Sequence, residues 1–124
     1  MSLRDSIGAA RIGAPRQDAD GAIVFEFKFG ADDPIFAGHF PGRPILPGVV
    51  QLEMTRVTAE TILNCPLAVR EIRKAKFQRP ILPSETVQVQ LKLSRKDGAI
   101  HARAEFSVGG QSAGETSLLL WQSE

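Results

Sequence analysis

The sequence contains few of the residues that most often supply cross-linking or reactive groups. It has one cysteine, Cys65, together with two histidines, one tryptophan and no tyrosine. A single cysteine excludes an intramolecular disulfide and a cysteine-based metal cluster, which is typical of a protein from a reducing compartment. We therefore expect a cytoplasmic protein.

Long apolar runs and an excess of charge are also missing. No stretch approaches the ~20 apolar residues that span a bilayer, and the N-terminal segment has no apolar core of the length found in signal peptides. The formal net charge of +1 provides no overall field for holding nucleic acid or an anionic membrane. We expect neither a nucleic-acid partner nor insertion into a membrane.

The composition is that of one ordinary folded domain. The chain has 124 residues, 43% of them hydrophobic and 23% charged, which suits a single core. Residues 1–18 carry three arginines against two aspartates and have little apolar content, which leaves open a weakly ordered N-terminal arm over residues 1–20. Residues 21–124 are expected to form the domain itself.

Apolar patterns divide this domain into a strand, a helix and a set of later strands. Residues 21–30 alternate apolar and polar side chains, which predicts a strand with one buried face. Residues 49–64 contain no glycine or proline, and their apolar side chains spread around most of the circumference, which predicts a helix enclosed by other structure.

The segments beyond Pro66 alternate again and contain two hairpin signals. Asp97-Gly98 and Gly109-Gly110 supply the positive φ that two-residue turns need, so three or four antiparallel strands are expected. One strand, one enclosed helix and these strands predict an α+β domain whose antiparallel sheet wraps the helix. A dimer could pair the open edges of such a sheet.

The loop "GHFPGRPILPG", which leads into the predicted helix, surrounds one histidine with prolines and glycines. His39 is the only side chain in it that is suited to general acid and base chemistry near neutral pH. Proline restricts the backbone and so reduces the entropy lost in reaching a reactive geometry. The alternative is a proline-rich turn whose histidine hydrogen-bonds to the backbone.

Two residues at the start of the helix are suited to acyl chemistry. The N–H of Gly48 lies where unpaired amides and the helix dipole would stabilise negative charge on a carbonyl oxygen, unless Gly48 only permits the turn. Glu53 lies among apolar residues, where a carboxyl group retains its proton more readily and can donate it to a leaving group. Arg56 offers a competing account, because an ion pair three residues along would hold Glu53 ionised.

The second histidine, His101, is predicted to lie on the solvent side of a strand. It alternates with Ile100 and Ala102, so its neighbours on the same face are Ala99 and Arg103. No cysteine or aspartate stands at ligand spacing from it, so no metal site is predicted.

Two strings carry a resemblance to a known family. "GHFPGRPILPGVVQLEM" closely resembles the signature of 3-hydroxyacyl-acyl carrier protein dehydratases, and "KAKFQRPILPSETVQVQLKL" is similar to the second strand pair of that family. The resemblance implies the hot dog fold, in which an antiparallel sheet wraps one long central helix, usually paired into a homodimer or a larger assembly of dimers.

The resemblance also implies a reaction. A (3R)-3-hydroxyacyl thioester, carried on the phosphopantetheine of acyl carrier protein in fatty-acid or related lipid or polyene synthesis, would lose water to give the trans-2-enoyl thioester. No metal or redox cofactor is implied. His39 matches the catalytic histidine that takes the C2 proton, Glu53 matches the acid that helps the C3 hydroxyl leave, and the Gly48 N–H would hold the thioester carbonyl. The family usually has glutamine where this chain has Val57.

Two other functions stay open. The hot dog fold also supports thioesterases, and a non-catalytic acyl-binding subunit could partner an active homologue if the Arg56 pair disables Glu53.

Docking of the carrier protein is the remaining expectation. Because carrier proteins are acidic, the densest basic run is the candidate docking surface, unless it is only the solvated side of a strand. That run consists of Arg70, Arg73, Lys74, Lys76 and Arg79.

Overall fold

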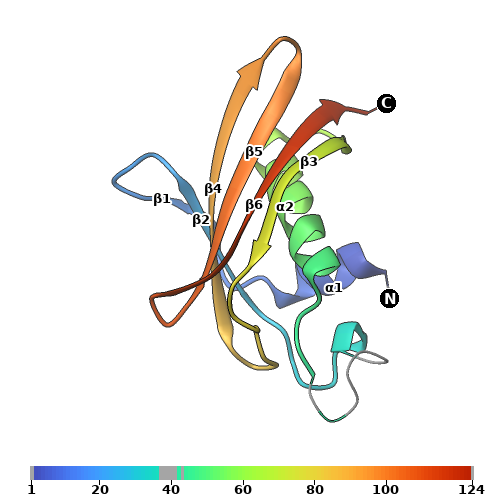
Figure 1. Ribbon diagram of the computed structural model, residues 1–124, viewed down its shortest axis with the longest axis vertical. Helices are drawn as coiled ribbons and strands as arrows, with labels where there is room; N and C mark the ends of the chain where they lie inside the picture. Colours follow the sequence, from blue (N-terminus) through green and yellow to red (C-terminus); the bar gives the residue numbers. More distant parts are fainter. Residues whose placement is uncertain (1, 37–41, 43, 124) are drawn as a thin grey trace.

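The computed structural model describes residues 2–36, 42 and 44–123 of the chain. Its elements are α1 (Leu3–Ala10), β1 (Arg16–Gln17), β2 (Ile23–Lys28), the 3-10 helix η1 (Pro34–Phe36), α2 (Gly48–Leu63), β3 (Leu67–Phe77), β4 (Thr86–Lys96), β5 (Ala99–Val108) and β6 (Gln111–Gln122). The six strands form one sheet that curves around α2, and α1 lies beside α2 (Figure 1). This confirms the predicted α+β arrangement of a sheet around one long helix.

The sheet has the strand order β1-β2-β4-β5-β6-β3, and every pair in it is antiparallel. Both predicted hairpin turns are confirmed. Asp97 and Gly98 join β4 to β5 with φ of 54° and 78°, and Gly109 and Gly110 join β5 to β6 with φ of 57° and 80°. Within the described residues β3 pairs only with β6, so its other edge is free.

Helix α2 is enclosed because it packs on the concave face of the sheet. Val50, Met54 and Ala59 are buried in the core. The hydroxyl oxygens of Thr55 and Thr116 lie 2.6 Å apart in a buried hydrogen bond that joins α2 to β6. These contacts fix the rotation of α2 about its axis and therefore the direction in which its polar side chains point. In the described part of the chain no helix is both long and apolar enough to cross a bilayer.

The N-terminal segment, for which a weakly ordered arm was left open over residues 1–20, contains regular structure. It contains α1, whose first turn is closed by reciprocal hydrogen bonds between Ser2 and Asp5, and it continues into β1. Ile7 of α1 is fully buried. A helix of eight residues is marginal alone, so the packing of Ile7 in the core adds to the hydrogen bonds of Ser2 and Asp5 in stabilising it.

Candidate active site

The structure places two of the three predicted active-site residues on α2, and His39 lies outside the described residues. The helix begins at Gly48, directly after Pro47, whose extended backbone has φ −63° and ψ 149°. Glu53 follows about one and a half turns later. Gly48 and Glu53 are therefore held by one rigid element.

Gly48 is required by a close contact rather than by an unusual backbone angle. A Cβ at this position would lie 2.5 Å from Cε2 of Phe77, the last residue of β3. Pro47 offers no side-chain acceptor to the first turn of α2, while its carbonyl accepts the N–H groups of Val50 and Gln51. The start of α2 thus combines the positive end of the helix dipole, which favours negative charge, with the ring of Phe77. The contact with Phe77 was not predicted, because Phe77 lies far from Gly48 along the chain.

Glu53 is ion-paired with Arg56, one turn further along the helix. The Nε of Arg56 donates to Oε1 of Glu53, which confirms the pair predicted from their spacing. The Glu53 side chain is 25% exposed and that of Arg56 is 19% exposed, so the pair is only partly open to solvent. Among the described residues none donates a hydrogen bond to the second oxygen, Oε2.

Arg56 is also held by Glu60, which sequence reasoning missed. Its Nη1 donates to Oε2 of Glu60 and to the backbone oxygen of Leu67, both at 3.0 Å. Arg4 of α1 lies 2.7 Å from Oε1 of Glu60, as an ion pair without the alignment of a hydrogen bond. Glu53, Arg56, Glu60 and Arg4 therefore alternate in charge from the middle of α2 to α1, and we call these four residues the charge ladder. The spacing of four residues between Arg56 and Glu60 could have predicted this link.

Glu60 is the most buried member of the charge ladder, at 8% exposure. Burial opposes its ionisation, but the Arg4 guanidinium, the Leu67 N–H at 2.7 Å and the charge of Arg56 outweigh this effect. The pKa of the Glu60 carboxyl is therefore lower than its ordinary value. Glu60 is ionised at neutral pH and holds both arginines.

The predicted carrier-docking run does not form one free basic cluster. Arg73 is ion-paired with Glu71 at 3.0 Å, and Lys74 with Glu115 at 3.2 Å. Lys76 is exposed and has no ion-pair partner among the described residues. Two of these three cations are thus partly neutralised by acids on β3 and β6.

The two ends of the run have different surroundings. The Arg70 guanidinium stacks 4.4 Å from the centre of the Trp121 ring. Arg79, just after β3, makes a two-point hydrogen bond with Glu85 at 2.8 and 3.2 Å. Arg79 follows closely on Phe77, the residue against Gly48, whereas Arg70 lies toward the other end of β3.

The chain is similar to dehydratases in both sequence and structure. Residues 15–116 match the family described as "ApeI-like: ApeI dehydratase". A 3-hydroxyacyl-[acyl-carrier-protein] dehydratase FabZ of Desulforamulus reducens is 35% identical over 97 residues, which cover 72% of this chain and 68% of that protein. The solved dehydratase heterocomplex ApeI:P from Xenorhabdus doucetiae superposes with a TM-score of 0.76 at 25% identity, covering 90% of this chain and 96% of the other.

A hypothetical thioesterase from Streptococcus pneumoniae, solved with coenzyme A, shares the fold alone. Its TM-score is 0.70, with coverage of 98% of this chain and 94% of that one, but its sequence is only 6% identical. The expected hot dog fold is thus confirmed.

Proposed function

Because this chain belongs to the ApeI-like dehydratase family, we propose that it removes water from a (3R)-3-hydroxyacyl thioester carried on acyl carrier protein, to give the trans-2-enoyl thioester. The observation that carries the proposal is the position of Glu53, on the helix that begins at Gly48, with one carboxyl oxygen that no described residue bonds. The named dehydratase relative supports the same substrate class.

The proposed reaction divides its tasks among three groups. His39 takes the C2 proton, the C2–C3 double bond forms, and the C3–O bond breaks. Glu53 in its protonated form delivers the proton on Oε2 to the departing hydroxyl, which leaves as water, and the carboxylate that remains is held by Arg56 at Oε1. The Gly48 N–H binds the thioester oxygen as it gains negative charge. We expect the reaction to need no metal or redox cofactor.

The purified protein tests this proposal directly when it is incubated with 3-hydroxyacyl thioesters of several chain lengths. We expect the loss of one water, measured by mass, from thioesters of carrier protein and of pantetheine. If the basic run of β3 docks the carrier, added salt should slow the carrier reaction and leave the pantetheine reaction nearly unchanged. Release of the free acid in place of the enoyl product would contradict dehydration and identify a thioesterase.

A second candidate is a non-catalytic acyl-binding subunit, which the Glu53–Arg56 ion pair favours. The ApeI:P heterocomplex shows that a dehydratase of this kind exists in a complex of two different chains. For this candidate the purified chain would bind the thioester without turnover, and activity would appear only with an active partner. Turnover by the chain alone would exclude it.

We further propose that the chain forms a dimer, through the free edge of β3 and the adjacent side of α2. Val49, Val69, Ile72 and Phe77 expose between 44% and 64% of their surface there. Association would pair the free strand edge and cover these apolar side chains.

Replacing Ile72 by lysine should weaken this dimer at least about tenfold in Kd, because a charge would enter the apolar centre of the contact. Light scattering over a protein dilution series measures the change. Ile12→Lys is the matched control, because Ile12 is 45% exposed, similar to Ile72 at 52%, but lies in the N-terminal segment. Equal masses for both variants would reject this interface.

A further inference from the structure

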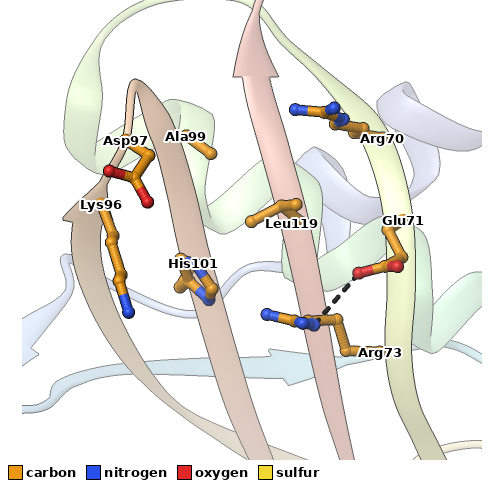
Figure 2. Close-up of a pocket in the computed structure, with 8 residues that line it drawn as sticks. All are labelled: Arg70, Glu71, Arg73, Lys96, Asp97, Ala99, His101 and Leu119. Carbon is orange, nitrogen blue, oxygen red and sulfur yellow. Dashed lines mark ion pairs between the residues drawn. The ribbon is translucent and has the colours of Figure 1, made fainter.

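The face of the sheet turned away from α2 carries a depression of about 450 Å³ that the proposed reaction does not use (Figure 2). Four basic side chains surround it, two from β3 and one each from β4 and β5. They are Arg70, Arg73, Lys96 and His101. The acids Glu71 and Asp97 also line it, and the apolar side chains of Ala99 and Leu119 lie between the basic groups. The depression therefore has a rim in which basic groups outnumber acids, and an apolar floor.

Two irregularities in β3 bring Arg70 and Arg73 to this face. In a regular strand, residues three positions apart point to opposite faces. The pairing of β3 with β6 shifts once between Val69 and Glu71, and again between Ile72 and Lys74. Each shift adds one unpaired residue, a β-bulge, and such bulges commonly re-aim side chains. Both arginines are therefore available to the same depression, as Figure 2 shows.

Only part of the basic charge around the depression is bonded to an acid. Among the described residues, no acid or other acceptor is bonded to Arg70, Lys96 or His101. Arg70 is instead held by the ring of Trp121, 4.4 Å from its centre, which orients the guanidinium and leaves its N–H groups free. Of the four basic residues, only Arg73 forms an ion pair among the described residues, with Glu71 at 3.0 Å.

We propose that this depression binds a small organic phosphomonoester. A phosphate group accepts several charge-assisted hydrogen bonds at once, which suits converging arginine and lysine side chains. The volume falls within the range of small-molecule sites and exceeds what a bare ion fills, so the apolar floor would contact the organic part of the ligand. The site shares no residue with the charge ladder or with the start of α2, and it does not depend on the dehydratase reaction.

Trp121 provides the measurement, because it is the only tryptophan of the chain and lies beside Arg70. We expect 4′-phosphopantetheine to change its fluorescence to saturation and inorganic phosphate to bind more weakly. Pantetheine, which lacks the phosphate, should cause no saturable change. Equal binding of phosphopantetheine and pantetheine, or phosphopantetheine binding no tighter than inorganic phosphate, would overturn the proposal.

Substitutions locate the binding within the depression. Lys96→Met and Arg73→Met should each weaken the Kd for phosphopantetheine about tenfold, because each removes one charge-assisted hydrogen bond. Lys92→Met is the control, since Lys92 lines a different cavity beside β2. Circular dichroism checks that each variant is folded. Unchanged Kd in both test variants, or binding of an acidic protein only, would reject this site. Lys96→Met should leave turnover of a pantetheine thioester unchanged, so failure here is separate from failure of the dehydratase proposal.

Discussion

Glu53→Gln should lower the rate of enoyl-thioester formation by about 100-fold to 10,000-fold, the range that general acid catalysis supplies. Glutamine keeps the size of the side chain and can still accept a hydrogen bond from Arg56, but it cannot deliver a proton from the position of Oε2. Substrate binding should change little. Initial rates over a range of thioester concentrations separate the two effects, because only kcat should fall.

Glu26→Gln provides the matched control for this substitution. Glu26 is also a partly exposed glutamate, at 34%, in an ion pair with an arginine, Arg16 at 3.2 Å, but it lies on β2 away from the helix. Its replacement should leave turnover unchanged. If Glu53→Gln and His39→Ala both kept the turnover of the unaltered protein, neither residue would carry the reaction and the proposed mechanism would be wrong.

The sequence predicted those parts of the fold that depend on local chemistry. The boundaries of α2 followed from Gly48 at one end and from Asn64, which adopts the left-handed conformation, at the other. The turns at residues 97–98 and 109–110 followed from the positive φ that their residues tolerate. Helix α1 was not predicted, although Ser2 and Asp5 cap it, because a helix of eight residues also depends on packing against distant segments. The bulges of β3 were not predicted, because they are defined by its pairing with β6, a distant strand.

In the candidate site, too, contacts between residues close in the sequence could be predicted, and contacts between distant segments could not. The pair of Glu53 and Arg56 could be predicted, because three residues in a helix bring side chains together. The contact between Phe77 and Gly48 could not, since it joins the end of β3 to the start of α2. The basic run from Arg70 to Arg79, continuous in the sequence, is not one free basic surface in the structure. Acids from β6 and from the segment after β3 form ion pairs with two of its members.

Arg56→Met should lower the free energy of unfolding by about 3 kcal/mol, the lower end of the range for breaking a buried ion pair from one side. Methionine preserves the apolar stem of the side chain but leaves Glu60, which is only 8% exposed, with Arg4 as its one cation. Urea unfolding at a fixed protein concentration measures the loss. Arg103→Met removes an arginine that also contacts two glutamates but is 57% exposed, and it should change stability by ~0.5 kcal/mol or less.

The pH dependence of this loss separates the charge of Arg56 from its packing. The pKa of Glu60 is lower in the folded protein than in the unfolded chain, so its ionisation stabilises the fold above about pH 4.3. That contribution to stability disappears as the pH falls through the pKa that Glu60 has in the folded protein. Without Arg56 the pKa of Glu60 is lowered less on folding, because one of its cationic neighbours is gone. The difference in stability between the unaltered protein and Arg56→Met should therefore be largest near neutral pH and should become smaller in acid. A difference in stability that stays constant with pH would mean that Arg56 stabilises the fold by packing alone. Its ion pair with Glu53 would then have no electrostatic role in placing the catalytic carboxyl.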